Sequence, residues 1–128
     1  IDQYPDGLPS GRAVATTAGD LPARWVIHTV GPVYSAREDR SHVLESCYRE
    51  SLRLAASLGA ASVAFPAISA GVYGWPIDDA ARIAVGTADA LAEEVGRVVR
   101  EVVFVPFGED AAAAFTRALA GLRRFPRD

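Results

Sequence analysis

The stretch "SVAFPAISAGVYGWP", residues 62–76, begins as an apolar run and ends in a loop with two glycines and two aromatic residues but no charge. The apolar part, residues 62–68, predicts an inner strand that helices cover on both faces. A loop of small residues between a strand and a helix can turn its backbone N–H groups inward, and the first turn of that helix adds partial positive charge. The stretch therefore predicts an α/β fold with an anion site that needs no cationic side chain.

Several residues equip this loop for a phosphate group. Gly71 and Gly74 permit positive φ and close approach of a ligand, and Ser69 adds a hydroxyl. Tyr73 and Trp75 offer flat apolar surfaces beside them, so a nucleotide diphosphate fits the set. A second interpretation stays open, in which the glycines only shape a tight connection. The loop matches neither the GxGxxG nor the GxxxxGK[ST] pattern.

Strands and helices alternate along the rest of the chain. We expect strands over residues 12–17, 24–32, 62–68 and 101–107, and helices over residues 41–58, 78–95 and 110–122. This alternation predicts an α/β sheet between helix layers. Ligands of such sheets bind beyond the carboxyl ends of the strands, where the loop of residues 69–76 is expected.

Size and charge narrow the class of protein. A chain of 128 residues, half of them hydrophobic, predicts one compact domain. Its net charge of -3 and pI near 5.3 argue against a general nucleic-acid or anionic-membrane surface. The single cysteine, Cys47, excludes an internal disulfide framework. With no signal-peptide pattern and no apolar run of membrane-spanning length, we expect a cytoplasmic protein that has no membrane partner.

Other reactive side chains have ordinary interpretations. His28 would be the natural general base, but a strand histidine with a backbone hydrogen-bond partner fits its position better. His42 is expected at the surface, and Cys47 is expected to be an inert buried thiol on a helix face. Asp78 and Asp79 begin a helix, which favours a cap and a favourable dipole charge over acid–base work.

Taken together, three runs resemble the macrodomain family. They are "GRAVATTAGDLPARWVIHTVGPVY", "LESCYRESLRLAASLGAASVAFPAISAGVYGWPIDDAARIA" and "VVFVPF", in the order and spacing of the branch that contains ADP-ribosyl hydrolases and O-acetyl-ADP-ribose deacetylases. The resemblance covers nearly all of residues 11–120. It implies a three-layer αβα sandwich with a mixed sheet, ADP-ribose in a cleft at the strand ends, and no metal or redox cofactor.

The resemblance also implies which residues bind the ligand. Backbone amides of one loop would wrap the diphosphate and the distal ribose; the loop consists of Ile68, Ser69, Ala70, Gly71, Val72, Tyr73 and Gly74. Tyr73 would lie against the distal ribose, and Phe107 would pack on adenine. The family usually has Thr where this chain has Ala70, so one side-chain hydroxyl is lost while the backbone donors remain.

Family members of this type carry two strands, an asparagine-containing loop and a glycine-rich segment with an aspartate before the part matched here. We therefore expect residues 1–128 to be one macrodomain without its N-terminal strands, with the catalytic aspartate upstream of Ile1. The resemblance implies binding of ADP-ribose or an ADP-ribosylated protein and, in the complete form, hydrolysis of ADP-ribose or its acetyl ester. The alternatives are a non-catalytic reader and, against the acidic charge, a binder of single-stranded RNA or poly(ADP-ribose).

Overall fold

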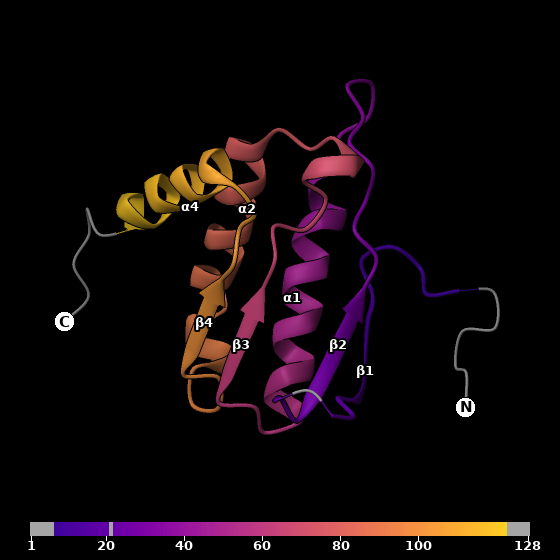
Figure 1. Cartoon of the computed structure of the whole chain (residues 1–128), viewed down its shortest axis with the longest axis vertical. Coiled ribbons are helices and arrows are strands. Elements are labelled where there is room, and N and C mark those ends of the chain that lie inside the picture. The colour runs from indigo at the N-terminus through magenta and orange to yellow at the C-terminus, as the bar shows by residue number, and fades with distance from the viewer. Residues whose placement is uncertain (1–6, 21, 123–128) are drawn as a thin grey trace.

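The computed structural model describes residues 7–20 and 22–122, in which strands and helices follow one another as expected (Figure 1). The strands are β1 (Ala13–Thr17), β2 (Trp25–Thr29), β3 (Ser62–Phe65) and β4 (Glu101–Phe104). The helices are α1 (Ser41–Ser57), α2 (Ile77–Ala90), α3 (Ala92–Val95) and α4 (Glu109–Leu122), with a short 3-10 turn, η1, over Gly71–Tyr73. The α/β class predicted from the sequence is confirmed.

The strands form two separate pairs. β1 and β2 are antiparallel, with Ala13 opposite Thr29, whereas β3 and β4 are parallel, with Ser62 opposite Glu101. Within the described residues no strand pairing joins β2 to β3, although both point the same way in Figure 1. The sheet is therefore mixed and divided, and α1 connects its two parts.

Helix α1 supplies much of the core. Its apolar residues recur at three- and four-residue spacing, and Leu44, Tyr48 and Leu52 are fully buried. The helix ends at Ser57, and after its cap Leu58 the chain turns at Gly59, whose φ is +78°. This is a Schellman arrangement, in which the Ala60 N–H donates to the Ala55 carbonyl at 3.0 Å. This stop turns the chain directly into β3.

The expected burial of residues 62–68 and 101–107 on both faces is wrong. β3 ends at Phe65, and its residues alternate between exposed Ala64 and buried Phe65. β4 alternates in the same way, with Val103 at 41% exposure. The reason is that α1 and α2 lie behind the strands on one face, while the described residues place no helix over the other (Figure 1). The helix expected over residues 78–95 is also divided, at Leu91, into α2 and α3.

Candidate functional site

The loop after β3 has an unusual backbone. Gly71 and Gly74 adopt positive φ of 74° and 76°, as the sequence predicts, but Ser69 does so too, at 67°. A residue with a side chain in this region costs about 1–2 kcal/mol. Ser69 is held there because it is buried and its Oγ donates a hydrogen bond of 2.6 Å to the Pro32 carbonyl. The loop is thereby attached to the segment that follows β2.

Tyr48 of α1 holds the start of the same loop through its hydroxyl group. Its side chain is fully buried on α1, and its ring lies edge-on to Phe65 at 5.0 Å between centroids. The hydroxyl accepts a hydrogen bond from the Ile68 N–H at 3.1 Å and donates one of 3.4 Å to the Pro66 carbonyl. Burial raises the pKa of Tyr48, so the hydroxyl keeps its proton and both roles. The point where the chain leaves β3 is thus fixed by a residue from another element.

A third support lies at the far end of the loop. The Tyr34 N–H donates to the Tyr73 carbonyl at 2.9 Å, and the Tyr34 ring meets the edge of Trp75 at 5.3 Å. The sequence predicts that Trp75 offers a free surface to a ligand. This prediction is wrong, because Trp75 is only 5% exposed. Its Nε1 donates to the Asp79 carboxylate at 3.0 Å, which ties the loop to α2.

Asp78 and Asp79 sit in the first turn of α2, as predicted, but neither caps the helix. Asp78 forms an ion pair of 2.5 Å with Arg117 of α4, and Asp79 binds Arg82 as well as Trp75. Burial alone would raise the pKa of Asp79, but the hydrogen bonds from Arg82 and Trp75 outweigh it and hold that pKa below its usual range. Both carboxylates are thus charged partners that join elements.

The backbone donors of the loop fall into two groups. The Ala70 N–H donates to the Ala67 carbonyl at 3.3 Å, and the Gly74 N–H donates to the Gly71 carbonyl at 2.9 Å. For the Ser69 and Gly71 N–H groups, the part of the chain that the structure describes contains no hydrogen-bond acceptor. The loop contains no charged side chain, and these two amides are available as donors for an anion.

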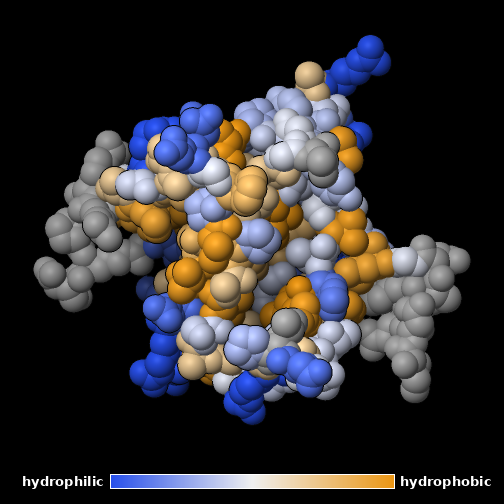
Figure 2. Space-filling model, in the orientation of Figure 1, coloured by the Kyte–Doolittle hydropathy of each residue, from blue (hydrophilic) through white to orange (hydrophobic). Residues whose placement is uncertain are grey.

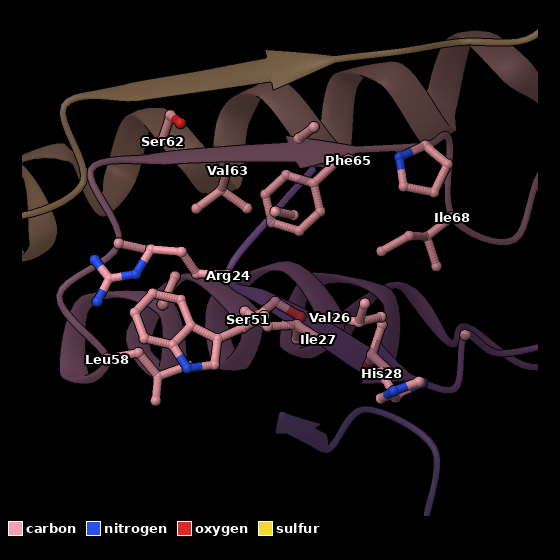
Figure 3. Close-up of a pocket in the computed structure, with 18 of the residues that line it drawn as sticks. Arg24, Val26, Ile27, His28, Ser51, Leu58, Ser62, Val63, Phe65 and Ile68 are labelled. Carbon is pink, nitrogen blue, oxygen red and sulfur yellow. The ribbon is translucent and has the colours of Figure 1, made fainter. Parts of the chain in front are cut away.

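A cavity of about 1050 Å³ opens beside the loop, between β2 and β3 (Figure 3). Among the predicted binding residues, Ile68, Ser69 and Tyr73 line its wall, and Tyr73 is 38% exposed. The other described ones, Ala70, Gly71, Gly74 and Phe107, do not line it. The side chain of Val72 lies outside the described structure.

Phe107 stands apart from the cavity with 97% of its surface exposed. It follows β4 just as the loop follows β3, and carboxyl ends of parallel strands meet at one edge of a sheet. Phe107 and the loop therefore lie at the same end of the β3–β4 pair.

Histidine and cysteine do not assemble a reactive centre. The expected backbone partner of His28 is wrong: its exposed ring lies 3.0 Å from the Thr16 hydroxyl, a side chain on the neighbouring strand. The surface position of His42 is confirmed. Cys47 is buried as predicted, its thiol donates to the Val30 carbonyl at 3.3 Å, and burial raises its pKa. A protonated, enclosed thiol is unreactive.

Within the described ranges, no cluster of three or more His, Cys, Asp or Glu residues is arranged to hold a metal ion. No helix in these ranges combines the length and the apolar character that crossing a bilayer requires.

Sequence reasoning missed Gly31 and Tyr48. A Cβ on Gly31 would collide with Ser69 Oγ and Ile68 Cγ2, so this glycine allows the loop to approach the end of β2. The "GP" pair at residues 31–32, directly after a strand, was the available signal. Tyr48 looked like an ordinary core residue because helical spacing predicts burial and says nothing about the partner of a hydroxyl.

Comparison with known proteins gives a consistent result. The family model described as "Macro domain" matches residues 1–84. A macro domain-containing protein of Streptomyces griseus is 64% identical over 92% of this chain and 65% of its own length. An O-acetyl-ADP-ribose deacetylase of Klebsiella pneumoniae is 50% identical over 88% of this chain and 64% of its own length. The chain thus spans slightly less than two thirds of these relatives.

Solved structures give the same answer for the fold. A mutant Oceanobacillus iheyensis macrodomain with ADPR superposes with a TM-score of 0.85 at 37% identity, covering 92% of this chain and 63% of that one. The Trypanosoma brucei macrodomain in complex with ADP-ribose gives a TM-score of 0.81 at 38% identity, covering 88% and 47%. The strand order, the helices between the strands and these matches agree, and the chain belongs to the macro domain family.

Proposed function

We propose that this chain binds ADP-ribose, with the diphosphate held by main-chain donors of residues 68–74. The observation that carries the proposal is a loop that is rigidly supported, has no charge, and leaves the Ser69 and Gly71 N–H groups without acceptors. The N-terminus of α2 follows at Ile77 and adds partial positive charge. The solved relatives with bound ADPR and ADP-ribose support the choice of ligand.

The rest of the ligand would meet two aromatic rings. Tyr73, on the cavity wall, would lie against the distal ribose, and Phe107 would pack on adenine. A phenylalanine that is 97% exposed leaves nearly its whole apolar surface in water, and stacking on a base would remove much of that surface. Its place at the carboxyl end of β4 supports this role.

We further propose that the complete protein removes ADP-ribose from modified proteins or deacetylates O-acetyl-ADP-ribose. The K. pneumoniae relative described as a deacetylase supports this step. Residues of the present chain would bind and orient the distal ribose, which can supply a large part of such a rate. The carboxylate that handles the attacking water would lie outside these 128 residues. The reduced, buried Cys47 is consistent with a cytoplasmic setting.

One observation favours the alternative, a reader without catalysis. The described residues that line the cavity include no Asp or Glu, so they supply no carboxylate that could act as a general base there. Turnover of O-acetyl-ADP-ribose separates the two functions: a reader binds ADP-ribose and leaves the ester intact.

The binding proposal is tested by isothermal titration of the chain with ADP-ribose, AMP and a single-stranded oligonucleotide at low and high salt. We expect ADP-ribose to bind more tightly than AMP, because AMP lacks the diphosphate and the distal ribose. Neutral main-chain donors should also make its affinity only weakly dependent on salt, whereas oligonucleotide binding falls steeply as counterions compete. Absence of ADP-ribose binding by a folded chain, or a preference for the oligonucleotide, would contradict the proposal.

A further inference from the structure

The chain between β2 and α1 is ordered by its own side chains in residues 33–40. The Arg40 guanidinium donates to the Val33 carbonyl at 3.0 Å and pairs with the Glu38 carboxylate at 2.6 Å. The Ser35 hydroxyl accepts a hydrogen bond of 3.2 Å from the Glu38 N–H. These contacts favour one conformation of an exposed segment, and a segment that is already ordered loses less freedom when it binds a partner.

This segment lies beside the proposed ligand loop. The Tyr34 N–H donates to the Tyr73 carbonyl at 2.9 Å, and the Tyr34 ring meets the edge of Trp75. In Figure 1 the chain between β2 and α1 extends past η1, at the end of the molecule to which β2 and β3 point. A ligand that continues past Tyr73 on this side therefore meets residues 33–40.

The segment presents apolar surface and a cation to solvent. Val33 is 52% exposed and Tyr34 is 41% exposed. Arg37 is also exposed, and its guanidinium has no ion-pair partner within the described ranges. The neighbouring carboxylates are engaged, one by Arg40 and one by the Ser41 N–H. Figure 2 shows strongly hydrophilic side chains at the tip of this part of the molecule. Because tyrosine and arginine are enriched in protein interfaces, the combination suits a polypeptide partner.

We propose that residues 33–40 dock the polypeptide of an ADP-ribosylated protein that has an acidic side chain near its modified residue. The inference rests on the proposed function, because it takes the distal ribose to lie against Tyr73. ADP-ribose is joined to a protein through the anomeric carbon of that ribose, so the polypeptide would leave the site beside Tyr73 and reach Tyr34. The acetyl ester of ADP-ribose ends at the ribose and has no group to place on residues 33–40. The segment thus favours a modified protein as the substrate class.

The apolar and the charged groups of the segment have different roles in this docking. Contact with Tyr34 and Val33 supplies most of the added affinity, because burying apolar surface stabilises a complex more than an exposed charge pair does. Arg37 provides the preference for an acidic neighbour, and salt screens its contribution.

Calorimetry with matched ligands tests the proposal. The ligands are free ADP-ribose and short synthetic peptides that carry ADP-ribose through a stable N-glycosidic bond to a central glutamine side chain. The residues that flank this glutamine are acidic, neutral or basic. We expect the acidic peptide to bind about tenfold more tightly than free ADP-ribose, the neutral peptide to be intermediate, and the basic peptide to gain nothing.

The free ligand separates failure of this inference from failure of the proposed function. Equal affinity for free ADP-ribose and the acidic peptide overturns the docking role and leaves ADP-ribose binding in place. A folded chain that binds neither ligand contradicts the proposed function, and the docking role with it.

Val33→Asp and Arg37→Glu connect the added affinity to the segment. Neither side chain belongs to the loop of residues 68–74 or to its supports, so affinity for free ADP-ribose should stay unchanged. Val33→Asp should weaken the acidic peptide by about threefold or more, because it replaces apolar surface with a like charge. Arg37→Glu should reverse the preference between the acidic and the basic peptide. Unchanged peptide affinities in both variants overturn the proposal.

Val98→Asp and Arg97→Glu are the matched controls. Both residues are exposed, Arg97 has no ion-pair partner among the described residues, and they precede β4 at the end of the strand away from the ligand loop. The same changes of charge there should leave every affinity as in wild type. An equal effect at residues 97 and 98 would assign the result to net charge, and would overturn docking at residues 33–40.

A photo-crosslinker beside the modified residue of the acidic peptide locates the contact directly. Attachment to residues 33–38 supports the proposal. Attachment confined to other parts of the chain, such as Phe107 or residues 22–31, overturns it, because the polypeptide would then leave the site in another direction.

Discussion

The loop after β3 is held by several hydrogen bonds, whereas the neighbouring edge of β3 that faces β2 has no paired strand among the described residues. In the loop, Tyr48, Ser69 and Tyr34 each contribute a hydrogen bond that fixes the backbone. Along the edge, the described residues offer no pairing to the strand, and the Ser51 hydroxyl below is left unsatisfied. The loop is held by contacts from several elements, whereas no strand pairing joins β3 to β2 in the described residues.

This difference shows that the contacts that hold the proposed ligand loop are independent of strand pairing between β2 and β3. The loop receives support from α1, from the segment after β2 and from α2. The described residues therefore fix the loop without any strand pairing between β2 and β3. The following predictions test this separation, beginning with the largest expected effect.

Gly71→Glu should remove ADP-ribose binding, with a loss of about 100-fold or more. It places a carboxylate where the diphosphate is proposed to lie, and like charges in contact cost several kcal/mol, at about 1.4 kcal/mol for each tenfold. A Cβ at Gly71 meets no atom within 4 Å, so the fold should survive with only the strain of a φ of +74°. Isothermal titration gives the affinity, and circular dichroism gives the fold.

Gly19→Glu is the matched control for this substitution. Gly19 also has positive φ, +60°, and open space around its Cβ, but it lies in the turn between β1 and β2. The same charge and the same kind of strain should leave ADP-ribose affinity unchanged there. Equal loss in both variants would mean that Gly71 acts through stability and not through the site.

Gly31→Ala should destabilise the chain by about 1–3 kcal/mol, as overpacking does. The new methyl group would press on Ser69 Oγ and Ile68 Cγ2 and force the loop away from β2. Urea unfolding measures the change. Gly86→Ala is the contrasting control: its Cβ would meet nothing within 4 Å in the middle of α2, so it should stabilise by about 0.5–1 kcal/mol. Destabilisation by both would contradict the close approach at Gly31.

Tyr48→Phe should cost about 1 kcal/mol of stability, since it removes the hydroxyl that binds Ile68 and Pro66 and keeps the packed ring. ADP-ribose affinity should fall as well, because the start of the loop loses its support. Tyr34→Phe keeps the ring contact with Trp75 and should change both quantities little. Urea titration and calorimetry on the two variants give the comparison, and equal affinities would show that Tyr48 supports only the core.

Asp79→Asn should have the smallest effect, and one that depends on pH. Because the pKa of Asp79 is lowered in the folded chain, its charge stabilises the fold above the unfolded pKa of about 3.9, and this contribution is lost as the pH falls through the folded pKa. The variant should therefore melt at a lower temperature than wild type near pH 7, and the two should converge as the pH falls below the lowered pKa of Asp79 in the folded chain. A difference that persists in acid would assign the effect to Trp75 packing.

The sequence predicted the positions of the helices and strands well, and the burial of individual side chains less well. Periodicity located α1 and α2, and Gly59 marked the end of α1, because these signals are local. The exposure of Ala64 and Val103 was missed, since an apolar strand looks the same whether or not a helix covers its second face. The burial of Trp75 depends on Tyr34 and Asp79, which the sequence alone does not bring together.

The candidate site shows the same limit. The glycines and the small residues of the loop predicted its shape, and positive φ at Gly71 and Gly74 is confirmed. The sequence did not predict the positive φ at Ser69. That conformation depends on a hydrogen bond from the Ser69 hydroxyl to the carbonyl of Pro32, which lies 37 residues away. The ligand contacts of residues 68–74 and Phe107 stay predictions.

A loop that offers N–H groups in place of charged side chains has a consequence for how the proposed site can change over generations. Every residue except proline has the same donor, so exchanging side chains such as Ala70 alters little, and escape from a competitive inhibitor through a point mutation becomes difficult. Resistance would have to alter the path of the chain, at Ser69, Gly71 or the distant Gly31. Such changes would weaken recognition of the natural ligand together with that of the drug.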